Sequence, residues 1–86
     1  MFVSLNELEL SGLKEIEEYV VSIPLKGDSG TLCAQLAGDH LIMFLIPPNL
    51  EELLDAGYTD DEAAPVVTMS PEDSERLVTY IRKVVA

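Results

Sequence analysis

Basic residues are scarce in this 86-residue sequence, and their scarcity excludes a first class of function. Lys and Arg number 5 against 16 Asp and Glu, which gives a formal net charge of −11 at pH 7. Direct binding to DNA, RNA or an anionic membrane depends on Lys and Arg that neutralise phosphate or headgroup charge. The sequence therefore predicts a protein that binds neither nucleic acid nor membrane directly.

Cysteine and histidine each occur once, as Cys33 and His40. A single cysteine cannot close a disulfide within the chain, which favours a reducing compartment. One thiol and one imidazole cannot supply the four nitrogen or sulfur ligands of a structural zinc site. The run of acids at 60–62 lacks the alternating ligands and the glycine of a calcium-binding loop. We therefore expect no metal ion and no cofactor.

Arrangements of residues that support catalysis are also missing. A two-residue turn at Gly38–Asp39 pairs Ala37 with His40. Cys33 then pairs with Phe44, so the thiol and the imidazole lie out of register. No glycine-rich segment is followed by the Lys and Ser or Thr of a phosphate-binding loop. The sequence predicts no catalytic residue and no enzyme.

Long apolar segments are absent as well. The longest apolar run is Leu41–Pro48, with eight residues, whereas a transmembrane helix needs about 20. The first residues show neither the positive charge nor the small-residue cleavage site of a secretory signal. These features predict a soluble, cytoplasmic protein. Its length is that of one domain, so we assign residues 1–86 to a single domain.

Alternating apolar and polar residues predict three β-strands in the middle of the chain. The predicted strands are Tyr19–Lys26, Thr31–Ala37 and His40–Ile46, separated by turn residues at 27–30 and 38–39. Glycine in first position of the second turn favours type II′ geometry. The third strand is apolar on both faces, which is typical of a strand that is covered on both sides.

Helix signals are clearest near the C-terminal end. Ser70 is a favoured cap, Pro71 is favoured at the first helical position, and acids follow in the first turn. Apolar residues then recur at helical spacing, which predicts a helix over Pro71–Val85. A second, short helix is predicted over Leu50–Ala56, with Asn49 as its cap and a glycine as its stop.

Three segments have weaker patterns. Tyr58–Ala64 is predicted as a polar loop or irregular turn, and Pro65–Met69 as a short strand or an extended entry to the last helix. Residues 1–16 carry a capping-box pattern at Ser4–Glu7 and predict a helix or a helix-turn-helix. A glycine at 12 and a local alternation at 8–10 interrupt that helical pattern.

The predicted fold class is α+β: a three-stranded antiparallel meander, with a fourth short strand as an option, packed against the C-terminal helix. The second face of the sheet needs cover, either from the N-terminal segment or from a second copy of the chain. A symmetric homodimer through the sheet or its edge is therefore an open alternative. The predicted core consists of Val21, Ile23, Leu25, Leu32, Leu36, Leu41, Met43, Leu45, Leu77, Ile81 and Val84.

The strongest functional signal is the segregation of charge along the chain. No Lys or Arg lies between Lys26 and Arg76, and this stretch holds eleven acids, nine of them within residues 51–75. We expect these residues to form an acidic face that binds a basic protein surface, because opposed potentials speed association and set orientation. The candidate partner-binding residues are Glu51, Glu52, Asp55, Tyr58, Asp60, Asp61 and Glu62.

This pattern favours a small non-enzymatic regulator or inhibitor. Its sharpest form is a nucleic-acid mimic that occupies the phosphate-binding groove of a nuclease, repair enzyme or polymerase. The small size and acidity are similar to those of phage-encoded DNA mimics and nuclease-immunity proteins, a likeness of composition that transfers no residue. Three alternatives stay open: a structural domain that is acidic only for solubility, adaptation to high salt, and a small-ligand-binding module.

Overall fold

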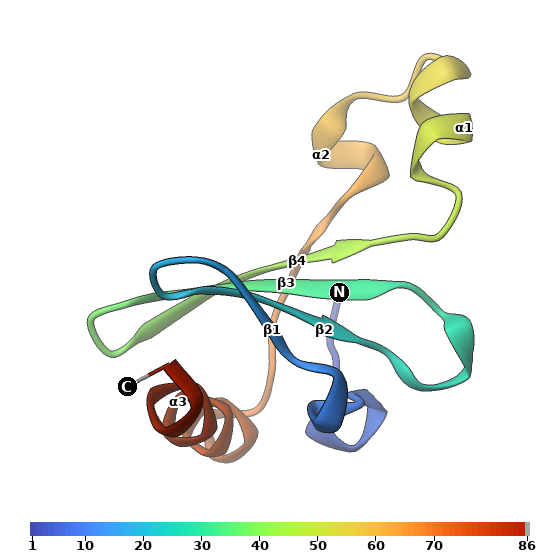
Figure 1. Ribbon diagram of the computed structural model, residues 1–86. Helices are drawn as coiled ribbons and strands as arrows, with labels where there is room; N and C mark the ends of the chain where they lie inside the picture. Colours follow the sequence, from blue (N-terminus) through green and yellow to red (C-terminus); the bar gives the residue numbers. More distant parts are fainter. Residues whose placement is uncertain (86) are drawn as a thin grey trace.

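Five antiparallel strands form one sheet in the order β1-β2-β3-β4-β5, so each strand pairs with its neighbour in the sequence (Figure 1). The computed structural model describes residues 1–85. The fold is α+β, as predicted, but the sheet has five strands where the sequence predicts three or four. The strands are β1 Lys14–Glu17, β2 Val20–Pro24, β3 Thr31–Ala37, β4 His40–Ile46 and β5 Val66–Val67.

The hairpin of β3 and β4 has the predicted register. Ala37 pairs with His40, and Cys33 pairs with Phe44. Gly38 has a φ of 64°, whereas Asp39 lies outside the positive-φ region, as a type II′ turn requires. Because side chains alternate along a strand, this register sends every second side chain of both strands to the core.

The N-terminal residues are the part of the fold that the sequence prediction gets wrong. In place of a helix or a helix-turn-helix, two 3-10 turns, η1 Leu5–Glu7 and η2 Leu10–Gly12, lead into β1. The capping box at the start of η1 is confirmed. β1 shows no apolar alternation because all four of its residues are exposed at the sheet edge, and its register shifts between Glu15 and Glu17.

Helix α3, Pro71–Val85, covers one face of the sheet and has the predicted bounds. The Asp73 N–H donates to Ser70 Oγ at 3.2 Å, which caps the first turn. Leu77 and Ile81, one turn apart, are fully buried against the sheet. The helix therefore supplies the apolar layer that closes the core.

The two N-terminal turns lie on the same side of the sheet as α3, which Figure 1 shows below the strands. Asp73 Oδ2 accepts a hydrogen bond from the Leu5 N–H at 3.1 Å. The Tyr80 hydroxyl donates to the Leu10 carbonyl at 3.2 Å. The first and last segments of the chain thus cover the same face together.

Most of the predicted core is confirmed. Leu25, Leu41 and Leu45 are only partly buried, and Val84 is 49% exposed, so its assignment to the core is wrong. Val85, one full turn after Ile81, packs against the core instead, because the orientation of α3 turns that position toward the sheet. The buried core cluster comprises Val3, Leu8, Val21, Ile23, Leu32, Ala34, Leu36, Met43, Val67, Leu77 and Ile81.

The second face of the sheet is left open by the elements in residues 1–85. Ile42 and Phe44, which alternate with the buried Met43 on β4, are 44% and 37% exposed. Of the two alternatives for covering this face, the N-terminal segment is excluded, because that segment lies beside α3. β4 is therefore apolar on both faces, but other elements of residues 1–85 cover only one of them.

The short helix α1, Leu50–Asp55, is confirmed close to its predicted bounds. Asn49 occupies the N-cap position, as predicted, but its side chain makes no capping hydrogen bond. Figure 1 shows α1 rising from the end of β4 on the side of the sheet opposite α3. It therefore takes no part in covering the core.

The polar segment after α1 contains a second short helix, α2 Asp60–Ala63, where the sequence predicts a loop or irregular turn for Tyr58–Ala64. Thr59 and Glu62 form a capping box around it. A capping box and three first-turn acids stabilise even a single turn of helix. The chain then enters β5, which confirms the short strand predicted within 65–69.

Replacing Ile81 by alanine should lower the free energy of unfolding by about 2–5 kcal/mol, because it leaves a cavity in the layer that closes the core. Val84→Ala is the matched control on the same helix, and its exposed side chain predicts a change within about 0.5 kcal/mol. Urea denaturation followed by circular dichroism measures both. Equal, small losses in the two variants would show that α3 does not dock through Leu77 and Ile81.

Candidate partner-binding surface

Residues 49–64, which we call the acidic arm, form an excursion from the sheet between β4 and β5. Pro47 and Pro48 precede the arm and Pro65 follows it. The Pro65 carbonyl accepts a hydrogen bond from the Leu45 N–H at 3.0 Å, which fixes the returning chain beside β4. Proline restricts the backbone at both feet of the arm, so the arm leaves and rejoins the sheet along defined directions.

A Schellman-type cap ends α1 and turns the chain toward α2. Gly57 has a φ of 98°, a conformation that favours glycine. Its N–H donates to the Leu54 carbonyl, and the Tyr58 N–H donates to the Leu53 carbonyl, both at 3.1 Å. The Tyr58 side chain is 50% exposed at this corner of the arm.

The capping box of α2 holds one of the candidate carboxylates in place. Glu62 Oε1 accepts from the Thr59 N–H at 3.0 Å and from the Thr59 hydroxyl at 2.9 Å. Thr59 Oγ1 accepts in turn from the Glu62 N–H at 3.3 Å. The backbone hydrogen bond, helped by the side-chain one, lowers the pKa of Glu62 below its ordinary value of 4.5. Glu62 therefore stabilises the arm itself.

The structure brings all seven candidate residues together on the acidic arm. They lie on α1, on α2 and on the connection between them, and the two helices pack against each other. All of their side chains are exposed. The seven are Glu51, Glu52, Asp55, Tyr58, Asp60, Asp61 and Glu62.

The acids of 51–75 that lie beyond the arm are placed elsewhere. Glu72, Asp73 and Glu75 belong to the first turns of α3, on the opposite side of the sheet from the arm (Figure 1). Asp73 and Glu72 are also engaged there, with the Leu5 N–H and with Arg76. The acidic segment of the sequence thus presents two separate surfaces, and within residues 1–85 no Lys or Arg pairs with a carboxylate of the arm.

Cations of the chain do not neutralise the arm. Among residues 1–85 the two ion pairs are Arg76 with Glu72 at 3.4 Å and Arg82 with Asp39 at 2.8 Å. Neither involves a carboxylate of the arm. Six carboxylates on one short excursion therefore repel each other and attract external positive charge.

Sequence reasoning missed an apolar surface at the foot of the arm. The exposed side chains of Phe2, Ile42, Phe44 and Val66, which we call the apolar strip, lie on the open face of the sheet. Phe44 pairs with Val66 across β4 and β5, and Phe2 bridges to Thr68 just beyond. The two-sided apolar pattern of β4 signals that such a surface needs cover, but it does not show which face other elements leave open.

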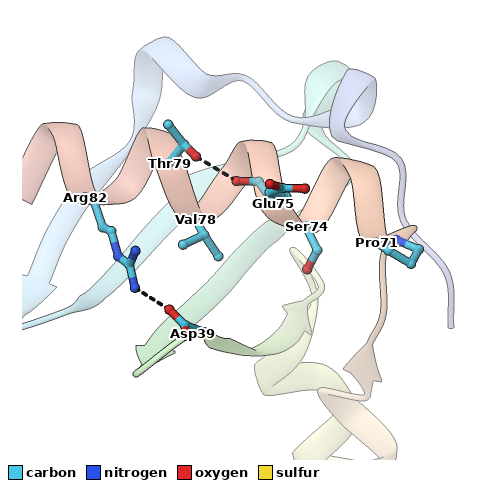
Figure 2. A pocket seen from close by; sticks show the side chains of 7 residues that line it. All are labelled: Asp39, Pro71, Ser74, Glu75, Val78, Thr79 and Arg82. Atoms are coloured by element: carbon cyan, nitrogen blue, oxygen red, sulfur yellow. Dashed lines mark hydrogen bonds and ion pairs between the residues drawn. The ribbon is translucent and has the colours of Figure 1, made fainter.

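A shallow groove of about 380 Å³ runs between α3 and the β3–β4 turn, and Figure 2 shows the side chains that line it. Arg82 donates to Asp39 Oδ1 and, at 3.1 Å, to the Gly38 carbonyl. The Thr79 hydroxyl donates to the Glu75 carbonyl at 3.0 Å. The two contacts of Arg82 tie the turn to the helix, whereas the hydrogen bond of Thr79 lies within α3.

Other kinds of site have little support in the part of the chain that the structure describes. Within residues 1–85, no three His, Cys, Asp or Glu side chains are gathered as a metal ion would need. None of the helices in this range has the length and apolar composition required to cross a membrane. No family model, no curated protein and no solved structure matches the chain.

Lowering the pH should weaken the cap of α2. Because the pKa of Glu62 is lowered in the folded chain, its contribution is present above the ordinary value and is lost as the pH falls through the lowered one. Thr59→Ala removes the hydroxyl but keeps the backbone N–H, so a carboxyl-carbon NMR titration should show the pKa of Glu62 rising only part of the way toward its ordinary value. Thr59→Ser, which keeps the hydroxyl, is the control and should leave the pKa low; an unchanged pKa in Thr59→Ala would contradict the contribution of the side-chain hydrogen bond.

Proposed function

We propose that this protein is a non-enzymatic interaction protein, a small regulator or inhibitor, whose acidic arm binds a basic surface on another protein. The observation that supports the proposal is the arm itself. It gathers six exposed carboxylates, and the ion pairs of residues 1–85 leave all of them free of internal cations. A partner that supplies Lys or Arg would neutralise this charge and relieve the repulsion within the arm.

The construction of the arm favours recognition over solubility alone. Charge that serves only solubility works at any position on a surface. Here the carboxylates are held by prolines at both feet, by a glycine-based helix end and by the capping box of Thr59 and Glu62. A fixed array of charge sets the orientation of an incoming partner, which a dispersed net charge does not.

A nucleic-acid mimic is the sharpest form of this proposal. Grooves that bind phosphates are lined with Lys and Arg, which are the side chains that the carboxylates of the arm would meet. Such a partner would be a nucleic-acid-processing enzyme, and this protein would compete with its substrate. The expected competition gives the proposal a direct readout once a partner has been captured.

Charge reversal on the arm should abolish capture of a basic partner. The variant is Glu51→Lys, Asp60→Lys, Asp61→Lys; Glu62 is spared because it caps α2. The control, Glu15→Lys, Glu18→Lys, Glu75→Lys, changes the net charge equally at exposed positions outside the arm. Immobilised wild type and control should retain the same protein from a lysate of the source organism, and the arm variant should lose it.

The association and dissociation rates of that complex should show whether binding depends on the charge of the arm or on the net charge of the protein. Reversal on the arm should slow association about tenfold or more and change dissociation less, because exposed charges act mainly on encounter. High salt should weaken wild-type binding, since it screens exposed charges. Equal effects of the arm and control variants would show that the acidity is a bulk property, and capture of no partner at low salt would contradict the proposal outright.

Tyr58→Ala should weaken the complex mainly through its dissociation rate, whereas charge reversal on the arm acts mainly on the association rate. A half-exposed aromatic side chain at the corner of the arm is a typical anchor once a partner desolvates it. Its removal should raise the dissociation rate about tenfold or more and leave the association rate nearly unchanged, as surface plasmon resonance on the captured partner would measure. An unchanged dissociation rate would exclude Tyr58 from the binding residues.

A further inference from the structure

The apolar strip lies partly on an inner strand of the sheet, a position where large apolar side chains are usually buried. Ile42 and Phe44 lie on β4, an inner strand of the sheet, and Val66, which is 59% exposed, pairs with Phe44 from β5. Monomeric proteins rarely expose contiguous apolar patches of large side chains, and such patches mark interaction sites. Phe44, in the centre of the strip, belongs to the aromatic residues that are enriched in the cores of protein interfaces.

The apolar strip and the acidic arm are adjacent, because the arm connects β4 to β5 and these two strands carry most of the strip. The arm leaves the sheet directly after β4 and returns to it at β5, so the pair of Phe44 and Val66 lies at its foot. Figure 1 shows the arm rising on the side of the sheet that α3 leaves open. An occupant of the open face would therefore meet apolar side chains below and carboxylates beside it.

The open face itself is nearly neutral. Its side chains on β3 and β4 alternate with the core and include no Asp, Glu, Lys or Arg. They are Thr31, Cys33, Gln35, Ala37, His40, Ile42, Phe44 and Ile46. The negative charge next to the strip thus comes from the arm, and it defines one edge of the apolar area.

A second copy of the chain is a poor match for this surface. Each copy carries a net charge of −11, and three of its five cations, Arg76, Arg82 and Lys83, lie on α3 behind the sheet. Lys14 and Lys26 are all that remains to meet the six carboxylates of the facing arm. The charge complementarity points to an occupant that is apolar on one side and basic on its border.

We infer that the apolar strip and the acidic arm form one docking surface for an amphipathic, basic segment of another protein. Apolar side chains of that segment would cover Ile42, Phe44 and Val66, and Lys or Arg at its edge would pair with the carboxylates of the arm. This inference rests on the proposed function and adds a second contact to it. Burial of the strip would supply affinity, and the arm would supply orientation.

A synthetic peptide can stand in for the unidentified segment. The probe is an 18-residue labelled peptide with Leu on one helical face and Lys on the other, and binding is followed by fluorescence anisotropy. A Leu/Glu peptide of the same pattern tests the charge requirement, and a Ser/Lys peptide tests the apolar one. Wild type should bind the Leu/Lys peptide at least tenfold more tightly than either of the others.

Matched variants then test the strip. Phe44→Thr, Val66→Thr keeps strand-favouring residues and should weaken binding of the Leu/Lys peptide at least tenfold. The single Val66→Thr is matched by Val84→Thr, the same substitution at a similarly exposed position on α3, which should change binding less than twofold. Circular dichroism shows whether each variant is folded, and Val66→Thr, at the short edge strand, provides the test if the double variant is not.

The outcomes separate this inference from the proposed function. If charge reversal on the arm abolishes binding but the strip variants bind as wild type, the proposed function stands and the docking surface is overturned. If neither set of variants alters binding, both are overturned. If analytical ultracentrifugation shows a dimer that the strip variants dissociate, a second copy covers the strip, and the inference of a basic partner segment is wrong.

Discussion

The docking of α3 on one face of the sheet is the contact on which the rest of the structure depends. Leu77 and Ile81 close the core from the helix side. Asp73 and Tyr80 of the same helix hold the N-terminal turns in place through the backbone of residues 5 and 10. The N-terminal turns and α3 therefore lie in one layer, on the same face of the sheet. Within residues 1–85 the other two helices, α1 and α2, rise away from the sheet, so its second face stays open.

The elements with strong local signals were predictable from the sequence. A strand pair joined by a turn that begins with glycine, and a helix with a serine cap and a spaced apolar stripe, are each specified within a few residues. β1 was not predictable, because an exposed edge strand has no alternation. α2 was hidden in a polar run, where only the spacing of Thr59 and Glu62 marked a helix start.

The candidate surface, too, was predictable from the sequence only in part. Its acidic residues were predictable because charge is read directly from the sequence, and the arm gathers all seven candidates. The apolar strip was not, because the pattern of β4 shows apolar residues on both faces without showing which face other elements cover. Which face stays exposed depends on the side of the sheet on which the N-terminal turns lie. That side is set by hydrogen bonds of the Leu5 and Leu10 backbone with α3, a helix about 70 residues away in the sequence.

The position of the acidic arm in the strand order has a consequence for how this protein can vary. Because β4 and β5 pair antiparallel, the arm is the loop of a β-hairpin, enlarged to hold two helices. The entropy of closing a loop grows only with the logarithm of its length. The arm can therefore be lengthened or shortened with little effect on the ladder that closes beneath it. The proposed binding residues and the buried core cluster lie in separate stretches of the chain, so the arm can diverge while the core is kept.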